Sequence, residues 1–183
     1  MKLVAIDIGN SSINIGFFIG ESLVIQKIKT TPLLPSSDYA EMIKGFMAKG
    51  NIDKIPDGII ISSVVPGHTD AVKKAYSILS KKEPVVLTHK MKTGIEFQIN
   101  EPEKLGTDRI AAAAGACDLF GAPVAVIDFG TATTLNFIGS GNKYKGGSIM
   151  PGLELMRNSL FSGTAQLPDV TVSKPVSPLG KDT

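Results

Sequence analysis

The sequence shows its fold in the stretch Ile6-Asp7-Ile8-Gly9-Asn10-Ser11, because a second stretch of the same kind, Ile127-Asp128-Phe129-Gly130-Thr131-Ala132, follows about 120 residues later. In each stretch an apolar run leads to an acid, then to a glycine, then to small hydroxyl or amide residues. An apolar run of this kind is typical of a buried strand, and small polar residues after it are typical of a turn. The recurrence indicates an internal duplication, with a period far too long for a solenoid.

The first half predicts an α/β domain that opens with an antiparallel three-stranded meander. Apolar runs and alternating patterns predict the strands, and apolar residues at helical spacing predict the helices. In chain order we expect strands over 2–9, 13–19 and 23–29, a helix over 38–49, a buried strand over 58–65 parallel to the first, a helix over 69–82 and a short strand over 84–88.

The second half repeats the opening pattern but is shorter. After a small-residue helix over 107–119, we expect strands over 124–128, 135–139 and 143–149, a helix over 154–160 and a proline-rich tail. We place one domain at 1–114 and the second at 115–183. A second half built like the first needs several more elements, so we expect that this one is truncated or that its end pairs with another chain.

Composition is typical of a globular protein and excludes several classes of partner. The chain has 183 residues, of which 43% are hydrophobic and 20% charged, with a net charge of +2 and no block of like charge. No basic face for nucleic acid and no membrane-binding segment is indicated. The single cysteine, Cys117, excludes an internal disulfide and fits a reducing, cytoplasmic compartment.

The repeated strand–acid–glycine pattern suits the binding of a nucleotide. The carboxylates of Asp7 and Asp128 can hold a cation, the glycines let the backbone approach phosphate, and turn N–H groups and hydroxyls donate to phosphate oxygens. One copy alone is more often an ordinary strand end, whereas two copies suggest two hairpins that grip one nucleotide. A phosphate-binding P-loop and a dinucleotide fingerprint are both absent from the sequence. Residues 128–130 (Asp-Phe-Gly) lack the rest of the protein-kinase signature.

A third polar segment, Gly106-Thr107-Asp108-Arg109, opens the predicted helix over 107–119. An acid in a first helical turn is often only a cap or a partner of the helix dipole. Arg109, however, is one of only two arginines among nineteen basic residues, and a helix N-terminus suits a substrate carboxylate. Asp108 is then a candidate general base that takes a proton from an alcohol during phosphoryl transfer.

Other polar residues are given structural roles. His68 and His89 border predicted elements without a cluster of partners, so we expect both at the surface. Cys117 lies on the small-residue helix and is expected to be a core thiol.

Taken together, the motifs resemble those of type III pantothenate kinases, in order from the first strand to the last residue. They are residues 7–11 (Asp-Ile-Gly-Asn-Ser), 62–66 (Ser-Ser-Val-Val-Pro), Pro102 with Gly106, Asp108 and Arg109, 128–133 (Asp-Phe-Gly-Thr-Ala-Thr), 146–152 and 180–183 (Gly-Lys-Asp-Thr). The resemblance implies duplicated ribonuclease-H-like domains of the actin-like ATPase type, with mixed sheets, and a homodimer. It also implies ATP-dependent phosphorylation of pantothenate, the first step of coenzyme A synthesis, with Mg²⁺ and a monovalent cation, K⁺ or NH₄⁺.

The resemblance also implies roles for individual residues. Phosphate of ATP would lie on Asp7, Ile8, Gly9, Asn10, Ser11, Ser12, Ile13 and Asn14, with Mg²⁺ at Asp7. Asp108 would accept the proton, and Asp128 would hold the monovalent cation. Thr131 and Thr133 would meet ATP. Pantothenate would contact Gly106, Thr107, Asp108, Arg109 and Thr183.

One position departs from the family pattern. The family usually has a substrate-contacting tyrosine three residues before Pro102, and this chain has Ile99 there. Two alternatives to the pantothenate kinase remain. One is another kinase of the same superfamily that acts on a sugar or polyphosphate. The other is a non-catalytic regulator like the Bvg accessory factors.

Overall fold

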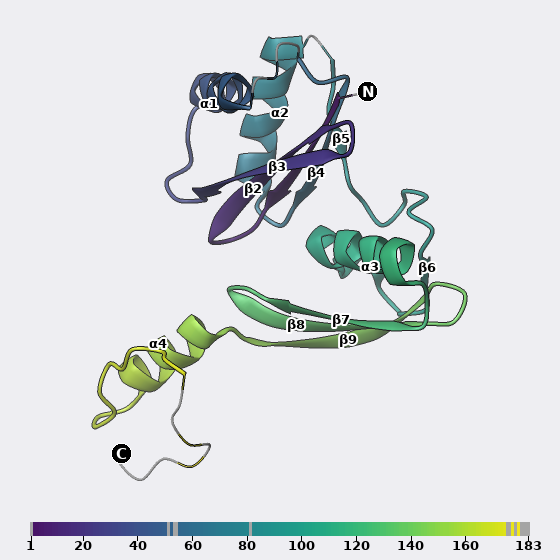
Figure 1. Cartoon of the computed structure of the whole chain (residues 1–183). Coiled ribbons are helices and arrows are strands. Elements are labelled where there is room, and N and C mark those ends of the chain that lie inside the picture. Colours follow the sequence, from purple (N-terminus) through teal and green to yellow (C-terminus); the bar gives the residue numbers. More distant parts are fainter. Residues whose placement is uncertain are drawn as a thin grey trace. The chain divides into compact units, whose positions relative to one another are not determined.

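The computed structural model describes residues 2–50, 52, 55–80, 82–174, 177 and 179. The chain divides into two compact units. Unit 1 comprises Met1–Val126 and Asn136–Gly146, and unit 2 comprises Ile127–Leu135 and Gly147–Thr183. Figure 1 shows the order of the elements along the chain. Within the described residues, no helix is both long enough and apolar enough to cross a membrane.

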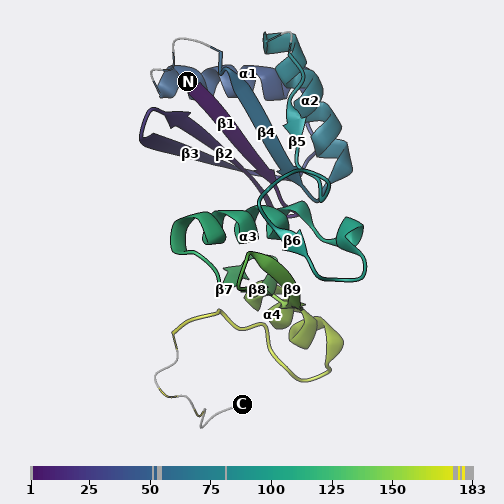
Figure 2. The same cartoon turned by 90° about the vertical axis from the view of Figure 1, so that its right-hand side faces the viewer.

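Unit 1 begins with a five-stranded mixed sheet in the order β3-β2-β1-β4-β5 (Figures 1 and 2). Strand β1 pairs antiparallel with β2 and parallel with β4, so the predicted meander and the parallel strand are both confirmed. Alternating Ile, Val and Phe residues form these strands because one side of each packs into a core. The elements are β1 (Lys2–Ile8), β2 (Ser12–Ile19), β3 (Ser22–Lys29), α1 (Ser36–Lys49), β4 (Gly58–Ser63), α2 (Pro66–Ser80) and β5 (Val85–Val86).

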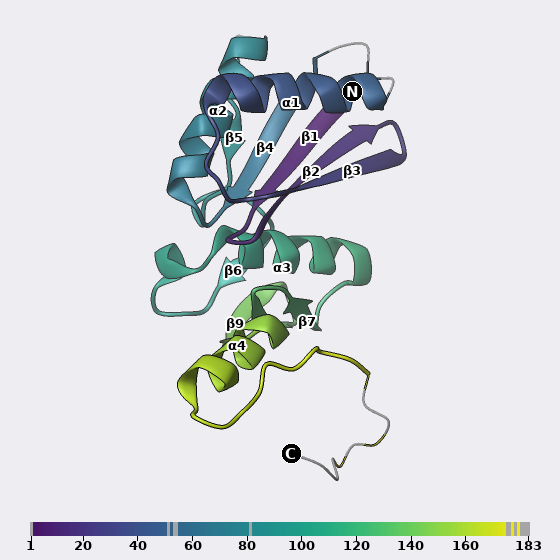
Figure 3. The same cartoon turned by 90° about the vertical axis from the view of Figure 1, so that its left-hand side faces the viewer.

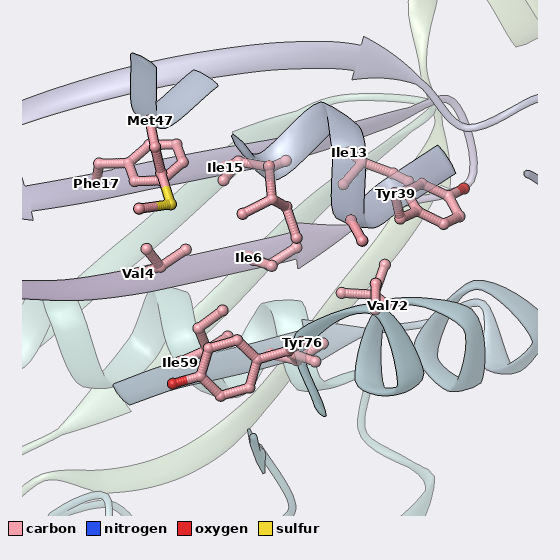
Figure 4. Close-up of a cluster of buried hydrophobic side chains, with 14 of the residues drawn as sticks. Val4, Ile6, Ile13, Ile15, Phe17, Tyr39, Met47, Ile59, Val72 and Tyr76 are labelled. Carbon is pink, nitrogen blue, oxygen red and sulfur yellow. The ribbon is translucent and has the colours of Figure 1, made fainter. Parts of the chain in front are cut away.

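Helices α1 and α2 cover one face of this sheet, as Figure 3 shows. Their apolar side chains meet the inward residues of β1, β2 and β4 in one core (Figure 4). Its fully buried side chains include Ile6, Phe17, Ile61 and Tyr76. Because every second residue of β1 enters this core, the carboxyl end of the strand is fixed in place. Asp7 is the last residue but one of this strand.

The expectation that His68 lies at the surface is wrong. Helix α2 begins at Pro66, three residues earlier than expected, since proline is well suited to a first helical position. His68 therefore falls in the first turn of the helix and faces α1, where it is 6% exposed. Its Nδ1 lies 2.7 Å from the hydroxyl of buried Tyr39. A buried histidine is satisfied by a hydrogen bond in this way.

A second sheet has the strand order β6-β9-β8-β7. Strand β6, only two residues long, was not expected from the sequence; it pairs parallel with the start of β9, with Phe97 opposite Tyr144. The expected α/β class with mixed sheets is confirmed. The remaining elements are β6 (Glu96–Phe97), the short 3₁₀ helix Pro102–Lys104, α3 (Thr107–Phe120), β7 (Val124–Phe129), β8 (Ala132–Gly139), β9 (Lys143–Pro151) and α4 (Leu153–Gly163).

Candidate active site

The first acid–glycine turn connects β1 to β2 in unit 1. The N–H of Gly9 donates to the carbonyl of Ser12 at 2.9 Å, which closes the turn. Asp7 stands opposite Asn14 in the β1–β2 register, and the Asn14 amide lies 3.5 Å from an Asp7 carboxylate oxygen. Asp7 is half-buried at the carboxyl end of a buried strand, as the sequence predicted.

The side chains of this turn differ in what they can offer a ligand. Ile8 and Ile13 are fully buried in the core, so their side chains are not available to a ligand. Asn10 and Ser11 are exposed, and Gly9, Ser12 and Asn14 are half-buried. The turn therefore presents backbone and small polar groups on a base fixed by two core isoleucines.

Thr30 anchors this turn, although no pattern in the sequence indicates this role. The residue directly follows β3 and is only 4% exposed. Its hydroxyl donates to the carbonyl of Gly9 at 2.6 Å, and its backbone N–H donates to the carbonyl of Ser11 at 3.2 Å. No local pattern distinguishes such a threonine, because its partners lie about twenty residues earlier in the chain.

The N-terminus of α3 is hydrogen-bonded to the end of β4 through Thr107. The Thr107 hydroxyl accepts from the Ser63 backbone N–H at 2.8 Å and donates to the Ser63 carbonyl at 3.0 Å. The hydroxyl of Ser62 lies 3.3 Å from it, and Ser62 is the parallel register partner of Asp7. These contacts bring the start of the helix that carries Asp108 to the strand end where Asp7 lies.

Asp108 lies in the first turn of α3, as predicted. One of its carboxylate oxygens accepts from the backbone N–H of Arg109 at 2.8 Å. A Cβ atom on Gly106 would collide with this carboxylate and would lie 3.5 Å from a Val64 methyl group. Glycine at position 106 thus leaves the space that the Asp108 side chain needs.

The guanidinium of Arg109 is held by two residues that no sequence motif indicates. Its Nε donates to Oδ1 of Asn136 at 2.6 Å, and the Tyr144 hydroxyl donates to the same oxygen at 2.6 Å. Asn136 is fully buried, and Tyr144 is 1% exposed. Burial raises the pKa of Tyr144, and the nearby Arg109 charge and hydrogen bond oppose the rise while the Asp108 charge adds to it.

Ile99 is half-buried against the core formed by Ala113, Ile138 and Tyr144. Its Cγ2 lies 3.9 Å from where a Cβ on Gly146 would be. In this chain, therefore, the position carries an apolar side chain that packs beside the residues holding Arg109.

The second acid–glycine turn connects β7 to β8 and lies in unit 2. The N–H of Gly130 donates to the carbonyl of Ala132 at 3.1 Å, and the N–H of Gly152 donates to the carbonyl of Thr131 at 3.0 Å. A Cβ on Gly152 would lie 2.6 Å from the Thr131 carbonyl oxygen and would also collide with that of Gly130. The chain therefore requires glycine at position 152.

The groups expected to bind ligands in this second turn are accessible. Asp128 and Thr131 are exposed, and Thr133 is half-buried. In the described ranges no three His, Cys, Asp or Glu side chains gather as a metal-binding cluster. Thr183 lies outside the described residues. The half-buried Cys117 has a thiol pKa raised by burial, so it stays protonated and is not an activated nucleophile.

Comparison with known families agrees with this arrangement. The family model for type III pantothenate kinases matches residues 3–183. The chain belongs to the type III pantothenate kinase family. A type III pantothenate kinase of Bifidobacterium longum subsp. infantis is 38% identical over 184 residues, which cover 99% of this chain and 72% of that protein. One from Finegoldia magna is 36% identical over 183 residues, covering 99% of this chain and 70% of that protein.

Solved structures share the fold. A conserved putative Baf family transcriptional activator from Campylobacter jejuni aligns with a TM-score of 0.50 at 21% identity, over 97% of this chain and 68% of that one. The activator of the 2-hydroxyisocaproyl-CoA dehydratase from Clostridium difficile, with bound ADPNP, aligns with a TM-score of 0.50 at 9% identity, over 82% and 46%. These likenesses show the fold alone, which is the expected actin-like ATPase fold.

Proposed function

We propose that this protein transfers the γ-phosphoryl group of ATP to pantothenate, which gives 4′-phosphopantothenate in the first step of coenzyme A biosynthesis. The observation that carries the proposal is the match of the family model to residues 3–183. The site supports it, because Asp7 and Asp108 are both present and are connected through Ser62 and Thr107 within one compact unit.

Asp108 acts as the general base for the acceptor alcohol. The hydroxyl oxygen of pantothenate forms a bond to the γ-phosphorus while the bond from that phosphorus to the ADP oxygen breaks. The hydroxyl proton passes to the Asp108 carboxylate. Its backbone hydrogen bond from Arg109 and the Thr107–Ser63 hydrogen bonds hold that carboxylate in a fixed orientation, which is what positioning catalysis requires.

The first turn, Asp7 to Asn14, holds the phosphates of ATP. In this proposal, backbone N–H groups of the turn and the exposed Asn10 and Ser11 side chains donate to phosphate oxygens. Asp7 fits a Mg²⁺ role, because this cation takes few protein ligands and a half-buried carboxylate beside phosphates is enough for one. When bound, Mg²⁺ would neutralise charge on the phosphate oxygens.

To the second turn we assign contacts with ATP and with a monovalent cation. Asp128 offers an exposed carboxylate oxygen, the kind of ligand that K⁺ takes, and it would equally accept a hydrogen bond from NH₄⁺. Thr131 and Thr133 contact ATP. Gly152 supports these roles, since its N–H fixes the carbonyl of Thr131.

The acceptor lies against the start of α3. We assign contacts with pantothenate to Gly106, Thr107, Asp108 and Arg109, and also to Ile99 and Thr183. The Arg109 guanidinium and the helix N-terminus both favour a carboxylate, and pantothenate carries one. The Thr107 hydroxyl already bonds to Ser63, so its contribution to the substrate is chiefly to place its neighbours.

The wider assignments follow the family. We propose a cytoplasmic homodimer that binds neither nucleic acid nor membrane, with ribonuclease-H-like domains at 1–114 and 115–183.

The first test is formation of ADP from ATP and Mg²⁺, with and without pantothenate and with and without K⁺ or NH₄⁺. Turnover that needs pantothenate and rises with the monovalent cation is expected. ATP binding without pantothenate-dependent turnover would reject pantothenate as the acceptor.

Asp108→Asn tests the proposed base in the same assay. The amide keeps the size of the side chain but cannot take the proton, so kcat is expected to fall by about 10²–10⁴-fold while the Kd for ATP stays within about twofold. A variant with unchanged kcat would show that Asp108 is not the base.

A further inference from the structure

Arg109 does not stand alone in the proposed acceptor site. It is a half-buried side chain whose Nε–H points to Oδ1 of Asn136, a residue with no exposed surface. Asn136 lies on β8, near its middle, whereas Arg109 lies in the first turn of α3. The hydrogen bond therefore fixes the direction of a long side chain from a separate, rigid element within unit 1.

The chemistry of the two groups determines which way the Asn136 amide faces. A guanidinium only donates, so the amide must present its oxygen to Arg109. That oxygen also accepts from the Tyr144 hydroxyl, and two donors at 2.6 Å occupy both of its lone pairs. The amide is thus held in one orientation by the hydrogen bonds from Arg109 and Tyr144.

Tyr144 can act as this brace over the whole physiological pH range. The residue comes from β9 and is 1% exposed. Burial raises its pKa above the ordinary tyrosine value of 10.0, so the hydroxyl keeps the proton that it donates. Its ring also packs against Phe97 of β6, with the ring centroids 6.1 Å apart. Tyr144 is therefore itself fixed in place by packing in a core.

We infer that Asn136, braced by Tyr144, is the positioning residue that orients Arg109, and that this pair sets the preference for acceptor alcohols bearing a carboxylate. The inference rests on the proposed function, in which Arg109 receives that carboxylate. Asn136 and Tyr144 are both buried, and in this inference they act through Arg109. Losing their hydrogen bonds leaves the Arg109 charge in place but lets the guanidinium change direction. The affinity for the carboxylate is therefore the first property to fall.

The first experiment observes the hydrogen bond directly. The chain has only two arginines, Arg109 and Arg157, so a ¹H–¹⁵N spectrum of Nε–H groups contains two signals, and Arg157→Lys assigns them. We expect the Arg109 signal to be protected from solvent exchange and to shift in Tyr144→Phe. An Arg109 signal that exchanges like that of Arg157 in the unaltered chain would overturn the inference, whatever the substrate.

The second experiment compares kcat/KM for pantothenate with that for pantothenol, in which an alcohol replaces the carboxylate. Tyr144→Phe is expected to raise KM for pantothenate about three- to tenfold, the effect of one hydrogen bond, while KM for ATP and for pantothenol stay within about twofold. Asn136→Leu is expected to have the larger effect in the same direction. Tyr76→Phe is the matched control, since Tyr76 is equally buried and donates only to the carbonyl of Pro56.

The outcomes separate the inference from the proposed function. Equal losses of kcat/KM with both acceptors in Tyr144→Phe would show a merely structural role and overturn the inference. The same loss of kcat/KM for pantothenate in Tyr76→Phe would also do so. An unaltered protein that phosphorylates neither acceptor would overturn the proposed function, and with it the substrate side of the inference. If Asn136→Leu fails to fold, Tyr144→Phe still decides the matter, because it removes one oxygen atom and no packing.

Discussion

The two acid–glycine turns carry similar sequences but are fixed by different means. The first turn is held by a side chain, since the buried Thr30 hydroxyl donates to the carbonyl of Gly9. In the second turn, the Gly152 backbone N–H donates to the carbonyl of Thr131. The strand before the first turn is buried at alternate positions, whereas Ile127 and Phe129 of β7 are 56% and 77% exposed.

This difference shows that each copy of the repeated motif is stabilised by a residue outside the motif. A side-chain anchor tolerates a conservative replacement that keeps the hydroxyl, whereas a close backbone approach tolerates no side chain at all. The two turns should therefore respond to substitution with different severity.

Gly152→Ala is expected to have the largest effect. The new Cβ would lie 2.6 Å from the Thr131 carbonyl oxygen and closer still to that of Gly130, so the backbone must move. We expect a loss of about 3 kcal/mol in the free energy of unfolding, measured by urea denaturation, and loss of ATP binding measured by calorimetry.

The control for this substitution is Gly163→Ala at the end of α4, where a Cβ would meet nothing within 4 Å. It should leave stability equal or slightly higher, because alanine favours a helix. Equal stability of the two variants would show that the close approach of Gly152 to the Gly130 and Thr131 carbonyl oxygens does not exclude a side chain at position 152.

Replacing the two acids separately tests whether the two turns bind different cations. Asp7→Asn should raise the Mg²⁺ concentration for half-maximal activity by roughly tenfold and leave the response to K⁺ unchanged, because an amide is a weaker cation ligand. Asp128→Asn should raise the K⁺ concentration for half-maximal activity and leave the response to Mg²⁺ unchanged. Titrations of activity with each cation measure both. Identical responses in the two variants would contradict separate roles for the turns.

Thr30→Val is expected to have the smallest effect. Valine has nearly the same shape but lacks the hydroxyl that donates to Gly9, so the free energy of unfolding should fall by about 1 kcal/mol. The KM for ATP should rise by less than about tenfold, since the turn keeps its Gly9–Ser12 hydrogen bond. Thr30→Ser retains the hydroxyl and should resemble the unaltered protein in both measurements. An unchanged free energy of unfolding in Thr30→Val, together with a lowered one in Thr30→Ser, would contradict this role of the hydroxyl.

The fold was largely predictable because its strands and helices have strong periodic patterns. Alternation in β1 and β2 and the stripe of α1 place these elements within a few residues of their observed bounds. The failures lie where a local pattern is too short or is overridden. Strand β6 has two residues and exists only because β9 pairs with it, and His68 is buried because α1 packs over the start of α2.

The acids and the polar helix start could be found in the sequence, because Asp7, Asp108 and Asp128 follow recognisable local patterns. Their supporting residues could not, because Thr30, Asn136 and Tyr144 act on partners distant in the chain, and a lone threonine, asparagine or tyrosine has no signature for that.

The fold class, the family and the candidate acids can be recognised in the amino-acid sequence, because each is encoded in local order and spacing. The side chains that hold those groups in place are set by three-dimensional packing. Thr107 binds Ser63, and Asn136 orients Arg109, across 44 and 27 positions of the chain respectively. Such contacts arise when packed elements meet, and a hydrogen bond depends on distance in space rather than on separation along the sequence.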